Sequence, residues 1–164
     1  MEPGDGKLRL FGRDRREKQR DLPLSCVFQE ATLMPWSNVH NNVRLPRDLA
    51  GVPRAEADTR VREILELVGL GQFGHVLPRE LSGGMQMRVS IARGLVTRPN
   101  VLLMDEPFGA LDEITRNQLD SDLLDLWQEQ KPTVVFVTHP IQEAGSLSPR
   151  VIMMAARHGR AGHA

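Results

Sequence analysis

The sequence is poor in cysteine and has no long hydrophobic run. Cys26 is the one cysteine among 164 residues, which excludes a disulfide within the chain and fits a reducing compartment. Because no acid–base partner stands near it in the sequence, we expect Cys26 to act as a small buried hydrophobe. No apolar stretch approaches the roughly 20 residues that span a bilayer, so we expect a soluble protein whose link to any membrane comes through a partner.

An excess of charge of one sign is also missing, and aromatic residues are few. The 21 Lys and Arg residues balance the 21 Asp and Glu residues, so no global field favours nucleic acid or a membrane surface. Aromatic side chains make up 4% of the chain, which leaves little for stacking on bases. With 40% apolar and 26% charged residues, the length favours one domain with a sizeable core.

A phosphate-binding P-loop is the third absence. The nearest approach is Gly4–Lys7, which reads Gly-Asp-Gly-Lys. The motif needs a glycine five residues before its Gly-Lys pair and a Ser or Thr after the lysine. Met1 and Leu8 occupy those two places, so the printed sequence offers no P-loop.

The most informative stretch runs from Leu81 to Asp112. It opens with Ser82–Gly84, a turn at the start of a predicted helix, where backbone N–H groups and the positive helix end suit a phosphate. The apolar run Val101–Met104 then predicts a buried parallel strand that ends at Asp105 and Glu106. Such carboxylates can hold a Mg²⁺ that bridges phosphate oxygens and polarise an attacking water.

Two further strands are predicted to end in polar side chains. Leu24–Phe28 reads as a short buried strand that ends at Gln29, and Thr133–Thr138 as a β-branched buried strand that delivers His139. Taken alone, such a glutamine is most often a solvated loop residue and such a histidine a structural one. The order of strands and helices, with polar groups at strand ends, predicts an α/β fold with a mainly parallel sheet.

Helical periodicity accounts for much of the rest. One helix is predicted from Pro53, in its first turn, to Gly69, with the apolar face Val61, Ile64, Leu65 and Val68. A second begins at Ser82, with the apolar face Met85, Val89, Ala92 and Val96. A third is expected after Leu111, with Leu119, Leu123, Leu126 and Trp127 on one face, and short strands are expected at Lys7–Phe11 and Val151–Ala155.

These motifs, in this order, resemble those of the ATPase subunits of ATP-binding cassette (ABC) transporters. Leu81–Gln86 resembles the signature motif, Val101–Glu106 the Walker B strand and Gly109–Asp112 the D-loop. The resemblance implies that Gln29 is the Q-loop glutamine and His139 the switch histidine. Within the family, Phe28–Trp36 and Met104–Asp112 are most similar to the nitrate/sulfonate/taurine importer group.

The resemblance also implies an organisation and a chemistry. It implies a P-loop NTPase-like fold. Residues 1–30 would form residual strands of the ATPase core up to the Q-loop, and residues 31–98 a helical subdomain that ends in the signature helix. Residues 99–164 would form the part of the core with the Walker B strand, the D-loop and the switch histidine. ATP hydrolysis with Mg²⁺ would follow. The catalytic residues would be Glu106, His139 and Gln29. The nucleotide-binding residues would be Ser82, Gly83, Gly84, Gln86 and Asp112, and the metal ligands would be Asp105 and Gln29.

Three departures from the family pattern concern the signature helix and the switch histidine. Met87 stands where Gln or Arg is common, and Gly94 stands where Ala is common. Gly94 is expected to cost the helix roughly 1 kcal/mol. Pro140 replaces the usual Asp beside His139, which is expected to perturb that turn.

The implied partners are a second ABC ATPase subunit and a transmembrane permease, with the chain bound peripherally at the cytoplasmic face of the inner or plasma membrane. Met34–Trp36 offers apolar bulk that suits docking, although simple packing explains it equally well. We expect no nucleic acid partner, since an ABC ATPase acting on DNA or ribosomes needs coiled coils or a second cassette.

The missing P-loop leaves the enzymatic role open. A late start, through a fragment or a misplaced start codon, and a degenerate subunit both fit the sequence. The alternative to an importer ATPase is accordingly a non-enzymatic cassette that supplies only its signature motif to a partner. As printed, the chain is expected neither to bind ATP tightly nor to hydrolyse it alone, because nothing replaces the lysine and the N–H cradle of the P-loop.

Overall fold

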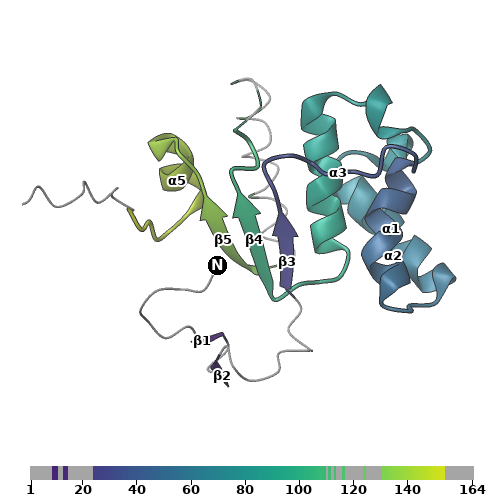
Figure 1. Cartoon of the computed structure of the whole chain (residues 1–164), viewed down its shortest axis with the longest axis horizontal. Helices are drawn as coiled ribbons and strands as arrows, with labels where there is room; N and C mark the ends of the chain where they lie inside the picture. The colour runs from purple at the N-terminus through teal and green to yellow at the C-terminus, as the bar shows by residue number, and fades with distance from the viewer. Residues whose placement is uncertain are drawn as a thin grey trace, which may run out of the picture.

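A three-stranded parallel sheet with helices packed on one face forms the centre of the computed structural model (Figure 1). The structure describes residues 9–10, 13–14, 24–109, 111, 113, 116, 124 and 131–153. The strands are β3 (Leu24–Val27), β4 (Val101–Asp105) and β5 (Thr133–Val137), in the order β3-β4-β5. Because both pairings are parallel, all three carboxyl ends lie at one edge of the sheet.

Helix α3 (Gly83–Leu95) packs against this sheet and begins directly after Ser82, the predicted first residue. The Ser82 hydroxyl accepts a hydrogen bond from the Met85 N–H at 3.2 Å and so caps it. Val89, Ala92 and Val96 are buried, as expected of its apolar face. The helix runs antiparallel to β4, so its first residues lie at the same end of the molecule as the carboxyl ends of the strands (Figure 1).

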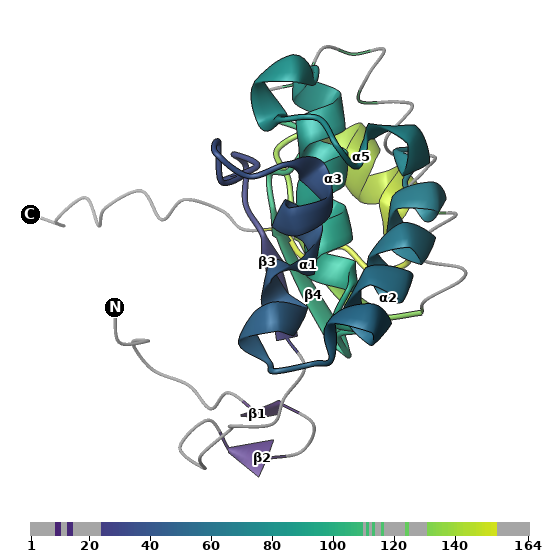
Figure 2. The same ribbon diagram turned by 90° about the vertical axis from the view of Figure 1, so that its right-hand side faces the viewer.

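Two more helices pack beside α3, away from the sheet (Figure 2). They are α1 (Val39–Leu49) and α2 (Arg54–Leu67), and short 3-10 turns η1 (Gly71–Phe73) and η2 (Pro78–Glu80) follow them. The predicted helix is therefore confirmed, with Pro53 directly before its first residue rather than in its first turn. Gly69 ends the segment with φ +71°, a conformation that favours glycine.

The side chains of the sheet show that the expectation for Cys26 was wrong. Cys26 is exposed, because it lies on the sheet face opposite the one that α3 covers. The same face carries Leu24, which is 41% exposed, and Val135 and Val137, which are each 51% exposed. Side chains alternate between the two faces of a strand, so β3 and β5 are half-exposed strands and not the fully buried ones predicted.

The ends of the chain differ from expectation in part. Arg9–Leu10 forms β1 within the predicted strand, and it pairs antiparallel with β2 (Arg13–Asp14). After β5 comes α5 (Ile141–Leu147), and the last strand predicted for Val151–Ala155 is not formed over residues 151–153, which are exposed. The Ser148 hydroxyl donates to the Arg150 carbonyl at 2.7 Å and closes a tight turn ahead of this segment.

The helix expected after Leu111 is described in part: Glu113, Arg116 and Leu124 are helical. Its predicted apolar face lies outside the described residues, as do residues 154–155 of the last strand; that face comprises Leu119, Leu123, Leu126 and Trp127. Within the part of the chain that the structure describes, none of the helices combines the length and apolar character needed to cross a bilayer.

Gly94 lies where α3 meets the sheet, and this contact is expected to offset the gain that alanine brings to a helix. An added Cβ would lie 3.3 Å from Leu102 Cδ1 and 3.4 Å from Val27 Cγ2, whereas Gly145 in α5 has nothing within 4 Å. Alanine in place of a mid-helix glycine gains up to about 1 kcal/mol where space allows. In urea unfolding, Gly145→Ala should therefore stabilise the chain more than Gly94→Ala does. Equal gains would show that the neighbours of Gly94 yield freely.

Candidate catalytic site at the strand ends

Glu106 and His139 meet at the carboxyl ends of two neighbouring strands. Glu106 follows β4 directly, and its backbone N–H donates to the Val137 carbonyl of β5 at 2.9 Å. His139 stands two residues beyond β5, and its Nε2 lies 2.7 Å from Glu106 Oε1. The carboxylate is partly buried while the imidazole is exposed, so the pair faces solvent where a substrate can reach it.

The backbone holds Glu106 in an unusual conformation. Its φ is +44°, in the left-handed region that non-glycine residues rarely adopt. A turn supports it, since the Gly109 N–H donates to the Glu106 carbonyl at 3.0 Å. Phe108, inside this turn, is fully buried and packs on Phe136 with ring centroids 5.8 Å apart. Strain of this kind persists only where the surroundings fix it, and here the core does so.

Gln29 reaches the same place from the third strand. It stands two residues beyond β3, and a Cβ built on Gly109 would lie 3.4 Å from Gln29 Nε2 and 3.6 Å from Glu106 Oε2. Both side chains therefore lie within van der Waals reach of the same position. Asp105, the last residue of β4, is exposed and directly precedes Glu106. The structure thus brings Glu106, His139 and Gln29, the predicted catalytic residues, to one edge of the sheet.

The turn Ser82–Gly84 lies near another predicted segment. A Cβ on Gly83 would lie 3.7 Å from Leu111 Cδ2, so this turn lies against Leu111 of the predicted D-loop. Asp112 lies outside the described residues. Gln86, also predicted to bind nucleotide, donates from Nε2 to the Pro78 carbonyl at 3.1 Å and to the Leu81 carbonyl at 3.3 Å. In this structure its amide nitrogen fixes the loop that precedes the turn.

Comparison with known proteins decides the family. The sequence model described as "ABC transporter" matches residues 1–109, about two thirds of the chain. The chain belongs to the ABC transporter family. Solved ABC structures agree with this fold. The dimeric post-hydrolysis state of an ATP-binding cassette bound to ADP and Pi matches with a TM-score of 0.73 and 31% identity, over 89% of this chain and 68% of that one.

A second solved ABC protein and two curated relatives extend the comparison. CbiO1 from Clostridium perfringens, part of the ABC transporter complex CbiONQ, matches with a TM-score of 0.68 and 29% identity, over 73% of this chain and 48% of that chain. The taurine import ATP-binding protein TauB of Rhizobium johnstonii is 47% identical over 95% of this chain and 59% of its own length. An uncharacterized ABC transporter ATP-binding protein of Methanocaldococcus jannaschii is 46% identical, over 96% and 58%.

These matches confirm two expectations. The fold is that of ABC ATPase cassettes, with a parallel sheet and helices. The resemblance to the nitrate/sulfonate/taurine group is supported by the match to TauB. The chain spans less than two thirds of the length of the curated relatives named above.

The ABC site offers oxygen ligands that fit a magnesium ion. No group of three or more His, Cys, Asp or Glu side chains able to hold a metal occurs among the described residues. Mg²⁺ needs few protein ligands, however, when phosphates and water complete its coordination shell. Asp105 and Gln29, with one carboxylate and one amide oxygen at adjacent strand ends, suit that sparse mode of binding.

Asn42 is a structural residue that sequence reasoning missed. It is fully buried in α1, and its Oδ1 accepts from the Met34 N–H at 2.7 Å. Its Nδ2 donates to the carbonyls of Met34, Ser37 and Asn38 at 3.1, 2.8 and 3.0 Å. One side chain thereby fixes the turn that carries the exposed Trp36. Asn38 before the pair Val39 and Val43, four residues apart, was the available signal for α1, since asparagine is a favoured helix cap.

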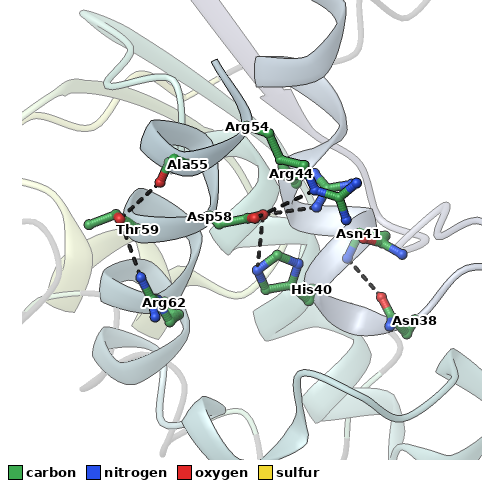
Figure 3. Close-up of a pocket in the computed structure, with 9 residues that line it drawn as sticks. All are labelled: Asn38, His40, Asn41, Arg44, Arg54, Ala55, Asp58, Thr59 and Arg62. Carbon is green, nitrogen blue, oxygen red and sulfur yellow. Dashed lines mark hydrogen bonds and ion pairs between the residues drawn. The ribbon is translucent and has the colours of Figure 1, made fainter. Parts of the chain in front are cut away.

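A polar pocket of about 610 Å³ lies between helices α1 and α2 (Figure 3). None of the strand-end residues described above lines it. It is lined by Asn38, His40, Asn41, Arg44, Arg54, Ala55, Asp58, Thr59 and Arg62. Asp58 is its centre: Arg44 Nη1 donates to it at 2.8 Å, and His40 Nε2 lies 3.5 Å away. The hydrogen bond from Arg44 holds the pKa of the Asp58 carboxyl below its ordinary value of 3.8.

Asp58→Asn is expected to lower the free energy of unfolding by about 0.5–1 kcal/mol at neutral pH, because the lost ion pair is partly exposed. The pKa of Asp58 is lowered on folding, so the stabilisation is complete above 3.8 and is lost as the pH falls through the folded-state pKa. Urea unfolding of both proteins from about pH 7 to about pH 2 measures this. Asp48→Asn, a more exposed partner of Arg44, should cost less. A difference for Asp58→Asn that stays constant down to about pH 2 would contradict the assignment.

Proposed function

We propose that this chain is the catalytic part of the ATP-binding subunit of an ABC importer for taurine or a related sulfonate or nitrate solute. The observation that carries the proposal is the Glu106–His139 contact of 2.7 Å at adjacent strand ends, with Gln29 at the end of the third strand. Relatives named taurine import ATP-binding proteins supply the importer class. This chain matches 59% of the length of the Rhizobium johnstonii relative, so the activity of the whole protein is proposed and not inferred from the match.

In this proposal the chemistry is hydrolysis of the terminal phosphate of ATP. Glu106 polarises the attacking water, and the turn at Gly109 keeps its carboxylate in place for that water. His139 and Gln29 contact the terminal phosphate, His139 being oriented by its contact with Glu106. Asp105 and Gln29 would hold Mg²⁺, which would supply positive charge beside the phosphate oxygens.

The remaining predicted site residues act across a dimer. The Ser82–Gly84 turn, at the positive end of α3, closes on a nucleotide held by a second ATPase subunit. Gln86 supports that turn through its bonds to the preceding loop. Asp112, by its resemblance to the D-loop aspartate, is proposed to act at the same interface. Positioning of this kind suits phosphoryl transfer, in which catalysis is mostly orientation and charge stabilisation.

The proposed permease contact uses the helical part of the chain. Trp36 is 78% exposed on the turn that Asn42 fixes, close in sequence to Asn38 at the rim of the polar pocket. An apolar anchor beside a charged pocket suits a protein partner. We place the chain at the cytoplasmic face of the membrane through this contact. Residues 31–98 form the helical subdomain between the core parts 1–30 and 99–164.

The test restores the missing phosphate site. An extended chain, in which this sequence is preceded by a strand and turn that carry a P-loop, should hydrolyse Mg-ATP. The 164-residue chain by itself should show no micromolar binding in calorimetry, because the residues that it contains offer no P-loop cradle. A folded extended chain without hydrolysis would contradict the enzymatic proposal and favour a cassette that only supplies its signature turn. Micromolar binding by the 164-residue chain would show that its phosphate site lies elsewhere.

A further inference from the structure

Arg93 joins α3 to the segment that follows Gln29. Its Nη1 donates to the Thr32 carbonyl at 2.9 Å. Its Nη2 donates to the Ala31 carbonyl at 2.9 Å and to Thr32 Oγ1 at 3.0 Å. One guanidinium thus binds three acceptors in two consecutive residues, about 60 positions away in the sequence. A planar fork of donors suits this arrangement, and a point charge does not reproduce it.

The bound segment is strained. Thr32 has φ +45°, and a β-branched residue in the left-handed region is a genuine outlier. Such a conformation persists only when surrounding contacts fix it, and strained residues cluster at functional sites. Both hydrogen bonds of Thr32 to Arg93 involve groups whose directions depend on that backbone conformation. Arg93 is therefore placed to hold the strained turn.

Gln29 lies three residues before this turn and has no helix or strand of its own to fix it. Its side chain approaches Glu106 across Gly109, so a change at Thr32 displaces Gln29 relative to the carboxylate. We propose that Arg93 is a positioning residue, which keeps Gln29 beside Glu106 by locking Thr32 in its left-handed conformation. The inference deepens the proposed function, because it rests on the role given there to Gln29.

The lock also connects two ends of the site. Helix α3 begins at the Ser82 cap and continues without interruption to Arg93. A helix of this length moves as a rigid element, so movement of the Ser82 turn reaches Thr32 through Arg93. Burial lowers the pKa of Arg93, but a guanidinium keeps its charge and its five donors in a folded protein. The link therefore persists across the ordinary pH range.

Amide hydrogen exchange in the 164-residue chain tests the lock without any nucleotide. Arg93→Ala should speed exchange over residues 27–34 by roughly tenfold, because local opening is read at the site where it occurs. The Met34 N–H, which donates to Asn42 Oδ1 at 2.7 Å, is the protected reporter in this segment. Exchange in α2 should stay within about twofold. Arg93→Lys should give a rate between those of Arg93→Ala and the unmodified chain. The matched control is Arg88→Ala, which removes a hydrogen bond from the same helix to the Val68 carbonyl. It should leave residues 27–34 unchanged.

A double variant distinguishes a role of Arg93 in holding the conformation of Thr32 from general stabilisation of the fold. Glycine adopts φ +45° without strain, so Arg93→Ala in a Thr32→Gly background should speed exchange by only about threefold. An equal increase in both backgrounds, or faster exchange throughout the chain, would overturn the proposal and leave Arg93 a residue that stabilises the fold. No change over residues 27–34 would overturn it as well. None of these outcomes depends on ATP hydrolysis by the extended chain, so failure of the proposed function is read separately.

Discussion

Glu106→Gln in the extended chain is expected to remove most ATP turnover, by about 10²–10⁴-fold, while ATP binding is retained. The amide keeps the shape and hydrogen-bonding capacity of the side chain but cannot polarise the attacking water. The contact with His139 Nε2 survives because the amide oxygen still accepts. With binding intact and hydrolysis blocked, the closed dimer should accumulate. Steady-state hydrolysis and size-exclusion chromatography with Mg-ATP measure the two effects.

The control for this experiment is Glu56→Gln. Glu56 lies on α2 and contacts Arg47 Nη2, so the variant removes a carboxylate of the helical part and leaves the strand ends unchanged. Its turnover should match that of the unmodified extended chain within about twofold, as surface substitutions usually have small effects. Undiminished hydrolysis in Glu106→Gln would show that another group polarises the water.

Phe108→Ala is expected to lower the free energy of unfolding by about 3–5 kcal/mol. The ring is fully buried, packs on Phe136 and lies inside the turn that follows Glu106. Its loss therefore leaves a cavity under the strained backbone of Glu106, whose φ of +44° then lacks support. Urea unfolding of the 164-residue chain measures the loss.

Phe73→Ala is the matched control, because Phe73 is 39% exposed in η1 and its removal leaves no closed cavity. Its cost should stay well below half of that for Phe108→Ala. Similar costs for the two variants would show that the core beneath Glu106 collapses around the smaller side chain.

The sequence predicted the elements whose signals are local. Ser82 before an apolar helical pattern set the start of α3, and Gly69 set the end of α2. Both depend on chemistry within one turn of the chain, which a reader of the sequence can see. Helix α1 was not predicted, and Pro46 inside it normally argues against a helix. Pro46 supplies no N–H to the helix, and packing of α1 against α2 and α3 offsets that loss.

The burial of the strands could not be predicted in the same way. Short apolar runs such as those of β3 and β5 read as buried on both faces, since parallel sheets usually are. Which face is covered depends on where α3 packs, and this is set by contacts between distant residues. Cys26 was misjudged for that reason. Its alternation with Val27, which is buried, follows from the pleat once the covered face is known.

For the candidate site, the sequence predicted which residues take part, but not the contacts that hold them in position. Asp105 ends β4, Glu106 follows it and His139 lies two residues beyond β5. Parallel strands end at one edge of a sheet. The left-handed conformation of Glu106 and the lock of Arg93 on Thr32 leave no local pattern in the sequence. They arise from tertiary contacts, which only the folded chain displays.

Because one face of the sheet is exposed, aggregation of the isolated polypeptide is expected to increase with its concentration. Leu24, Val135 and Val137 together present apolar surface that water solvates poorly, and equal numbers of acidic and basic residues provide little long-range repulsion near neutral pH. Dilute, moderately acidic or alkaline buffers of low ionic strength should therefore keep the polypeptide dispersed. Neutral, concentrated solutions should scatter light increasingly with time, as hydrophobic faces find one another.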